Sequence, residues 1–349
     1  MINEIYMQRC IDLAQNGRGR VAPNPMVGAV LVHDGKIIGE GIHLEYGQAH
    51  AEVNAIKDAE KKYKIIPENS ILYVNLEPCS HHGKTPPCAD LIIRKGIRNV
   101  IIGTKDPNPL VQGKGIEKLK FAGCEVHYEI LKNECRELNK TFYKFYEKHR
   151  PYIILKWAQS SDGFISSEHT NNSDQMHWIS NEYSRKLSHK WRSETQAIIV
   201  GTNTALHDNP SLNVRDWEGK NPIRIAFDKD LKLPKHLHLF DQSTPTLIFT
   251  QKKTSSNKNL EYINIDFNNG VIKEVLNGLY KRGIQSMIVE GGTTLLNSFI
   301  NENLWDEARI FIADKILIKG IKAPAISGSL IKEDQIENDL LLVYKRLEY

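Results

Sequence analysis

Three potential metal ligands lie close together between residues 50 and 88. His50 begins this stretch, Cys79 follows a proline, and Cys88 comes after eight intervening residues. Zinc binds imidazole nitrogen and thiolate sulfur, and a catalytic zinc takes three protein ligands and keeps a fourth position for water. Two neighbouring helix starts near the end of a strand can bring such side chains together. We therefore expect the first part of the chain to form an α/β arrangement that converges on these three residues.

Glu52 lies two residues after the histidine and is not expected to be a ligand itself. Zinc lowers the pKa of its water, and a nearby carboxyl group can move protons between that water and a leaving amine. His-x-Glu followed by Pro-Cys and a second cysteine is typical of zinc-dependent base deaminases, although their cysteines are usually only two residues apart. Two alternatives remain open. The site could be a structural zinc with His81 or His82 as a fourth ligand, or the cysteines could be buried apolar residues.

The length and composition predict a cytoplasmic protein with two domains. The chain has 349 residues, which is too long for one ordinary domain, and 40% of them are hydrophobic. The 46 basic and 42 acidic residues give a net charge of +4, without the basic faces of a nucleic-acid-binding protein. The five cysteines form no small disulfide framework and favour a reducing compartment. Neither a signal peptide nor a membrane-spanning segment is expected.

Apolar periodicity predicts alternating helices and strands in the first half of the chain. An Asp-Gly pair at Asp34 predicts a hairpin turn, and Val53 and Ile56 are expected to face the core. The expected helices cover residues 5–14, a segment that begins at His50, and residues 88–95, and the expected strands cover 27–32, 37–41, 71–76 and 99–103.

Other polar residues surround this predicted site in the sequence. Asn24 lies between two prolines and suits hydrogen bonding to a base edge, unless it is an ordinary turn residue. His43 is either a site residue or a surface histidine. Lys84 and Thr85 could hold a phosphate or a ribose, or could be solvated loop residues. Residues 106–109 form a turn cluster that could be a lid or a wall of a pocket.

Residues 23–28, 50–53 and 77–88 resemble the bifunctional deaminase-reductase family of riboflavin biosynthesis, and the long cysteine spacing fits that family. The resemblance implies a cytidine-deaminase-like three-layer domain over residues 1–147. This domain would convert the 2-amino group of a diaminopyrimidinone ribosylamino phosphate to an oxo group. The resemblance assigns zinc to His50, Cys79 and Cys88 and proton transfer to Glu52. It implies substrate contacts at Asn24, His43, His81, Lys84 and Thr85.

The segment from Glu134 to His149 is predicted to be one aromatic, charged helix. We expect it to cap the first domain or to pack between domains, and stacking on nucleic acid is the alternative. Pro151 disfavours a continuing helix, so the domain boundary is placed at Arg150–Pro151.

The second half of the chain alternates strands with helices, which implies a mostly parallel sheet. Two further segments, 309–317 and 340–347, could add edge strands. Strands are expected over 152–155, 197–200, 223–227, 246–249 and 287–289, and helices over 181–193 and 271–281.

Gly291 and Gly292 lie where a predicted strand leads into a helix. Backbone amides at such a point can hold a phosphate, but a Gly-Gly pair alone is most often just a turn, and the usual dinucleotide fingerprint is missing. The family resemblance continues over residues 156–163, 178–180, 201–204 and 208–212 and at Arg215. It implies that residues 151–349 form a dihydrofolate-reductase-like domain that uses NADPH to reduce the ribose to a ribityl chain. It implies cofactor contacts at Ala158, Trp178, Thr204, Asp208, Gly292, Thr293 and Thr294, and substrate contacts at Arg192, Leu212, Arg215 and Glu290. Arginines suit a sugar phosphate because guanidinium binds phosphate through two parallel hydrogen bonds.

Met176 departs from the family pattern, which usually has a serine two residues before the tryptophan. Methionine cannot donate that hydrogen bond, so either Ser173 or His177 replaces the serine or the reductase is weakened. The leading hypothesis is an enzyme that deaminates and then reduces. The alternatives are a deaminase with a degenerate second domain and a nucleic-acid base editor, which the low net charge disfavours. We expect a small-molecule substrate, no nucleic-acid or membrane partner, and a homo-oligomer, either a dimer or a tetramer.

Overall fold

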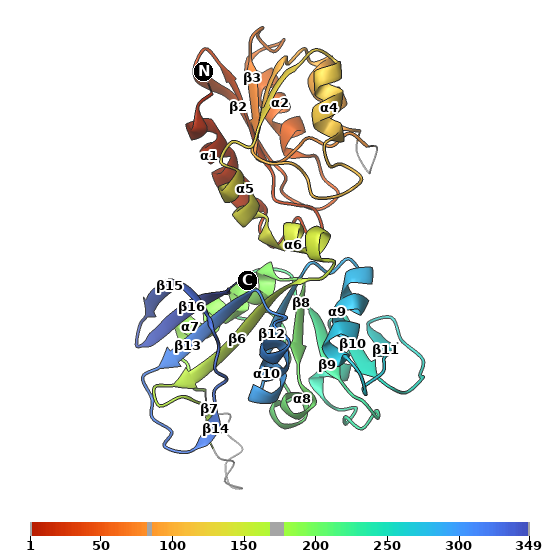
Figure 1. Ribbon diagram of the computed structural model, residues 1–349, viewed down its shortest axis with the longest axis vertical. Coiled ribbons are helices and arrows are strands. Elements are labelled where there is room, and N and C mark those ends of the chain that lie inside the picture. The colour runs from red at the N-terminus through yellow and green to blue at the C-terminus, as the bar shows by residue number, and fades with distance from the viewer. Residues whose placement is uncertain (1, 82–85, 168–177, 348–349) are drawn as a thin grey trace. The chain divides into compact units, whose positions relative to one another are not determined.

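The computed structural model describes residues 2–81, 86–167 and 178–347. The chain divides into two compact units, Met1–His149 and Arg150–Tyr349, each with its own sheet (Figure 1). Among the described residues, no helix is long and apolar enough to cross a membrane.

The first unit is built on a five-stranded sheet in the order β2-β1-β3-β4-β5. Strand β1 is antiparallel to β2 and β3, whereas β3, β4 and β5 run parallel to one another. The strands are β1 (Gly28–His33), β2 (Lys36–Ile42), β3 (Ile71–Val74), β4 (Asn99–Ile102) and β5 (Glu125–Tyr128). The helices are α1 (Glu4–Ala14), η1 (Gln15–Gly17), α2 (Ala51–Lys62), α3 (Cys88–Arg94), α4 (Lys114–Phe121), α5 (Lys132–Leu138) and α6 (Lys140–Lys148).

Helices cover both faces of this sheet because successive residues of a strand point to opposite sides. In β1, Ala29 and Leu31 join the apolar cluster that contains residues of α2, α3 and α4. Val30 and Val32 join a second cluster, which contains residues of α1. The unit therefore has three layers.

Two local features of the first unit depend on particular residues of the sequence. The predicted hairpin forms between β1 and β2, with Asp34 (φ 47°) and Gly35 (φ 72°) both left-handed, as a two-residue hairpin turn requires. Gly41 of β2 lets helix α2 approach closely, because an added Cβ would lie 2.0 Å from the Ala51 carbonyl oxygen. This approach brings the first turn of α2, and with it His50, against the sheet.

The second unit contains a nine-stranded sheet in the order β11-β10-β9-β8-β12-β6-β13-β16-β15. The strands from β11 to β13 in this order are parallel, β16 and β15 are antiparallel, and β7 pairs with β14 separately. The strands are β6 (Tyr152–Ser160), β7 (Phe164–Ser167), β8 (Ala197–Val200), β9 (Ile223–Phe227), β10 (Thr246–Thr250), β11 (Leu260–Asn264), β12 (Ser286–Glu290), β13 (Glu307–Ala313), β14 (Gly320–Lys322), β15 (Gly328–Ile336) and β16 (Asp339–Arg346). The helices are α7 (Glu182–Glu194), α8 (Thr202–Asp208), η2 (His238–Phe240), α9 (Val271–Lys281) and α10 (Thr293–Asn301).

This larger sheet is also covered on both faces, as parallel sheets are. In β8, Ala197 and Ile199 belong to the apolar cluster that includes α9 and α10. Ile198 and Val200 belong to the cluster that includes Ala205 of α8.

Three predictions about the elements need correction. The expected helix over 134–149 is two helices, α5 and α6, which are separated at Asn139, and the side chain of this residue bonds to the backbone of another segment. The expected edge strands over 309–317 and 340–347 are β13 and β16, and both are interior strands, because β13 lies between β6 and β16 and β16 lies between β13 and β15. In α2, Val53 is only half-buried, whereas Glu52 is buried with 3% exposed.

Candidate active sites

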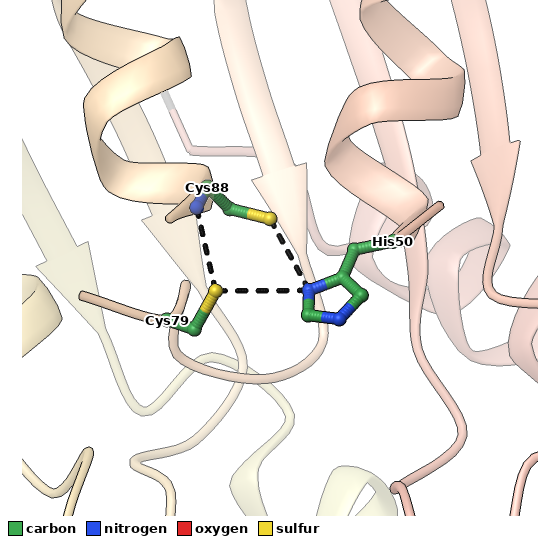
Figure 2. A group of neighbouring side chains, drawn as sticks. All are labelled: His50, Cys79 and Cys88. Carbon is green, nitrogen blue, oxygen red and sulfur yellow. Dashed lines mark hydrogen bonds between the residues drawn. The ribbon is translucent and has the colours of Figure 1, made fainter. Parts of the chain in front are cut away.

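The predicted metal ligands come together in the first unit. Figure 2 shows the side chains of His50, Cys79 and Cys88 pointing toward one another. His50 is the N-cap of α2, Cys88 is the first residue of α3, and Cys79 follows strand β3. The His50 Nδ1 atom lies 3.6 Å from Cys79 Sγ and 3.3 Å from Cys88 Sγ.

This donor set fits a zinc ion. One nitrogen and two sulfur atoms lie within 4.8 Å of one another. Zinc bonds of about 2.0–2.3 Å in a tetrahedron place two ligand atoms about 3.5 Å apart, close to the distances observed. Hydrogen bonding from the Cys88 side chain, followed by that from His50, lowers the pKa of Cys79 to about 4 against the effect of burial. The Cys79 sulfur also accepts a hydrogen bond from the Cys88 backbone N–H at 3.3 Å. Both effects favour the thiolate that a metal requires.

A cavity of about 370 Å³ adjoins this cluster. Glu52 lines it, and burial raises the pKa of the Glu52 carboxyl, so this group can hold a proton closer to neutral pH than an exposed glutamate can. The other predicted residues that line the cavity are Asn24, His43, His50, Cys79 and His81. Lys84 and Thr85 lie outside the described residues.

His43 is buried with 1% exposed, so the interpretation as a surface histidine is wrong. Its Nδ1–H donates to the Ala49 carbonyl oxygen at 3.1 Å, which leaves Nε2 to accept from the Asn24 side-chain amide, also at 3.1 Å. Burial lowers the pKa of His43, which keeps the ring in this neutral form. Asn24 is therefore held in a fixed orientation at the cavity wall.

The turn cluster at residues 106–109 forms part of the same wall, through Asp106 and Asn108. Burial, with a contribution from the charges of Glu77 and Cys79, raises the pKa of Asp106 to about 7. The Glu77 carboxylate holds this wall in place, because it accepts backbone N–H bonds from Asp106, Gly113, Gly115 and Ile116. The turn itself was visible in the sequence, but the four bonds to Glu77 were not.

Sequence reasoning missed three aromatic residues of this cavity, namely Tyr46 and two residues of α6. Phe142 and Tyr146 of α6 line it. Their spacing of four residues places them on one face of the helix. This pattern indicates a packed face, but it does not reveal that the face borders a cavity.

In the second unit, two predicted cofactor segments meet at the carboxyl ends of neighbouring strands. Residues 201–204 follow β8 and residues 291–294 follow β12, and these two strands are hydrogen-bonded neighbours. The Gly292 backbone N–H donates to Thr204 Oγ1 at 3.2 Å. Gly291 has φ 144°, and an added Cβ would lie 3.3 Å from the same hydroxyl, so glycine keeps this crevice open. Dinucleotides bind in such crevices at the carboxyl edge of parallel strands.

Two of the predicted substrate residues of this unit, Arg192 and Glu290, form an ion pair. Arg192 binds both carboxylate oxygens of Glu290, at 3.3 and 2.7 Å, and donates to the Asn213 carbonyl oxygen at 3.2 Å. Arg215 donates to the Asn213 side chain at 3.2 Å, so both arginines hold one loop. Lys156, which sequence reasoning did not single out, is the register partner of Glu290. The sequence feature that could have revealed it is a single lysine within the apolar strand β6.

The remaining predicted contacts of the second unit are more dispersed. Leu212 is buried with 2% exposed and packs in the core beside α8. Thr293 donates its hydroxyl to the Lys322 carbonyl oxygen, and Ala158 is half-buried in β6. Trp178 and Asp208 are exposed. Thr294 lies in the first turn of α10. Met176, Ser173 and His177 lie outside the described residues, so the structure does not test the departure at Met176.

Together these features define a zinc-dependent deaminase domain joined to a dinucleotide-dependent reductase domain. The cytidine and deoxycytidylate deaminase zinc-binding region matches residues 1–104, and the RibD C-terminal domain matches residues 151–340. The chain belongs to the RibD family, the bifunctional deaminase-reductases of riboflavin biosynthesis.

Relatives in this family align over nearly the whole chain. Riboflavin biosynthesis protein RibD of Aquifex aeolicus is 40% identical over 99% of this chain and 100% of its own length. The Bacillus amyloliquefaciens protein is 42% identical over 94% of this chain and 88% of its own length. The crystal structure of the Thermotoga maritima diaminohydroxyphosphoribosylaminopyrimidine deaminase/5-amino-6-(5-phosphoribosylamino)uracil reductase is 37% identical, with a TM-score of 0.88 over 99% of this chain and 98% of that one.

These findings confirm the predicted fold class, a cytidine-deaminase-like domain followed by a dihydrofolate-reductase-like domain. The protein is a bifunctional enzyme that acts on a small molecule and uses zinc and NADPH. Both domains match the family, so the matches support neither a deaminase-only protein nor a nucleic-acid base editor.

Removing the metal is expected to stop deamination and spare reduction. We expect one zinc per chain in the purified enzyme and none in the Cys88→Ala variant, because two remaining protein ligands are too few for a catalytic zinc. Elemental analysis measures the zinc, and separate assays measure each step. Cys124→Ala is the matched control, because Cys124 packs in the apolar core of the same unit. Zinc retained at full occupancy in Cys88→Ala would contradict the assignment.

Proposed function

We propose that residues 1–147 deaminate a diaminopyrimidinone ribosylamino 5′-phosphate and that residues 151–349 then reduce its ribosyl group to a ribityl chain. The observation that carries the first half is the convergence of His50, Cys79, Cys88 and the buried Glu52 at one cavity. The family relationship supports the substrate, because the Thermotoga maritima relative is named for these two reactions.

In the deaminase, His50, Cys79 and Cys88 would hold the zinc, which when bound lowers the pKa of a water molecule. Glu52 would take a proton from that water as it adds to the carbon that bears the amine. The same carboxyl group would pass this proton to the ring nitrogen beside that carbon and then carry the remaining hydroxyl proton to the amine, so that the carbon–nitrogen bond breaks, ammonia leaves and an oxo group remains. Five residues would contact the substrate, namely Asn24, His43, His81, Lys84 and Thr85.

In the reductase, NADPH would lie in the crevice between residues 201–204 and 291–294, and when bound it supplies the hydride. The hydrogen bond between Gly292 and Thr204 supports this placement, because it fixes backbone amides at the start of α10. Ala158, Trp178, Thr204, Asp208, Gly292, Thr293 and Thr294 would contact the cofactor. Arg192, Leu212, Arg215 and Glu290 would bind the substrate.

Arg192 would act in two ways at this site. Three of its five N–H groups bond to Glu290 and Asn213, and no other residue in the described part of the chain bonds the remaining two, which would be available to a phosphate. Arg215 would provide a second guanidinium beside it.

We also propose that the enzyme is a homo-oligomer, a dimer or a tetramer, of the cytoplasm. None of the five cysteines is in a disulfide, which suits a reducing compartment. Sedimentation velocity measures the oligomeric state, and a monomer at micromolar concentration would contradict the first part of this proposal.

A mass-resolved assay on the diaminopyrimidinone ribosylamino phosphate, with and without NADPH, tests the proposed function. Without NADPH, we expect the product mass in which an amine has become an oxo group. With NADPH, we expect two further hydrogens. A reaction that stops at the deaminated product in both samples would overturn the reductase half. An unchanged substrate mass in both samples would overturn the deaminase half.

A further inference from the structure

The amide side chain of Asn139 bonds to both polar groups of one distant residue. Its Oδ1 accepts from the Met26 backbone N–H at 2.8 Å, and its Nδ2 donates to the Met26 carbonyl oxygen at 2.9 Å. The two residues are 113 positions apart in the chain, and Asn139 is only 2% exposed. The partners also fix the orientation of the amide, because a backbone N–H only donates and a carbonyl only accepts.

A second buried amide supports the same segment. Asn75, which is fully buried, accepts from the Gly28 backbone N–H at 2.8 Å and donates to the Met26 carbonyl oxygen at 3.1 Å. That carbonyl therefore has two donors, whereas the Met26 N–H is bonded by Asn139. Loss of the Asn139 oxygen would leave this N–H without its partner.

Asn139 joins two walls of the deaminase cavity. The segment on either side of Met26 contributes Asn24, Pro25 and Val27 to the cavity lining. Asn139 is also the N-cap of α6, and that helix contributes Phe142 and Tyr146 to the lining. Val27 packs against the small apolar cluster that contains Phe142, so both walls share this cluster. Asn139 itself does not line the cavity.

We infer that Asn139 is a positioning residue of the deaminase site, which sets the distance between the Asn24 wall and the α6 wall and thereby the affinity for the pyrimidine. This inference rests on the proposed function. The zinc ligands and Glu52 are held by other elements, namely α2, α3 and the segment after β3. Asn139 should therefore act on substrate binding more than on the chemical step.

Asn139→Asp is the sharpest test because it changes one donor group. An aspartate can still accept from the Met26 N–H, but its second oxygen would face the Met26 carbonyl oxygen without a proton between them. We expect the KM for deamination to rise about ten-fold, with kcat changed less than about three-fold, as loss of a buried hydrogen bond that acts on binding predicts. Asn139→Ala removes both bonds and should raise KM at least as much.

Met26→Leu is the matched control, because it changes the side chain at the same place and keeps both backbone bonds. It should have the wild-type KM. Zinc content and NADPH-dependent reduction of the deaminated product should be unchanged in all three variants, which shows that each is folded. An unchanged KM in Asn139→Asp, or a fall in kcat that accompanies zinc loss, would overturn the inference. A wild-type enzyme that deaminates nothing would instead overturn the proposed function.

Discussion

Replacing Glu52 with glutamine is expected to lower the deamination rate by about 10²–10⁴-fold, the range that general acid–base catalysis contributes. Glutamine has nearly the same shape but cannot accept and return a proton. Glu52 is buried at the cavity wall, two residues from the metal ligand His50. NADPH-dependent reduction of the deaminated product should be unchanged, because it takes place on the other unit.

The measurement is a single-turnover deamination assay beside a steady-state reductase assay. Glu60→Gln is the matched control, since Glu60 lies on the same helix and pairs with Lys95. It should leave both activities intact. Deamination by Glu52→Gln at the wild-type rate would show that another group moves the proton.

Replacing Glu290 with glutamine is expected to reduce the reductase rate by about 100-fold or more and to destabilise the second unit by about 3–5 kcal/mol. The reason is that Arg192, with only 12% of its side chain exposed, would lose its buried ionic partner. Lys156, opposite Glu290 in the sheet, would add a second unbalanced positive charge. The deamination rate should not change.

Denaturant unfolding and an NADPH oxidation assay check this result, with Glu302→Gln as a control at an exposed position. Reductase activity and stability that both stay at the wild-type level would show that the pair is neither structural nor functional.

The pH dependence gives a further check on the same variant. Burial alone would raise the pKa of Glu290, but the charges of Arg192 and Lys156 outweigh it and lower the pKa to about 2. A carboxyl group with a depressed folded-state pKa contributes stability above its unfolded pKa and loses it as the pH falls toward the folded value. The stability difference between wild type and variant should therefore be full above about pH 4.5 and should shrink toward pH 2.

Local sequence rules predicted many elements of both units. Strands β8 and β9 and helix α9 have the bounds that their apolar patterns predicted. The hairpin at Asp34 formed because the turn depends on two adjacent residues with positive φ. Such features depend on a few neighbouring residues, so they can be recognised without knowledge of the rest of the fold.

Other features depended on contacts between distant segments. The break at Asn139 was not predicted, and the partner of its side chain, Met26, lies outside residues 134–149. The position of β13 inside its sheet depends on strand order, which its own sequence does not contain. The burial of Glu52 in place of Val53 depends on how α2 lies against β2.

The sequence by itself determined the chemistry of the first site, because few residue types bind zinc and His50, Cys79, Cys88 and Glu52 carry a recognisable spacing. Only the tertiary structure decided which residues surround that chemistry. Asp106, Phe142 and Tyr146 reach the cavity from segments that follow the metal ligands in the chain. The position of Asp106 depends on a hydrogen bond to Glu77. The positions of Phe142 and Tyr146 depend on α6, whose N-cap Asn139 bonds to the distant Met26 backbone. The residue types determine which reaction the site can carry out, whereas contacts between distant segments determine the shape of the pocket in which it occurs.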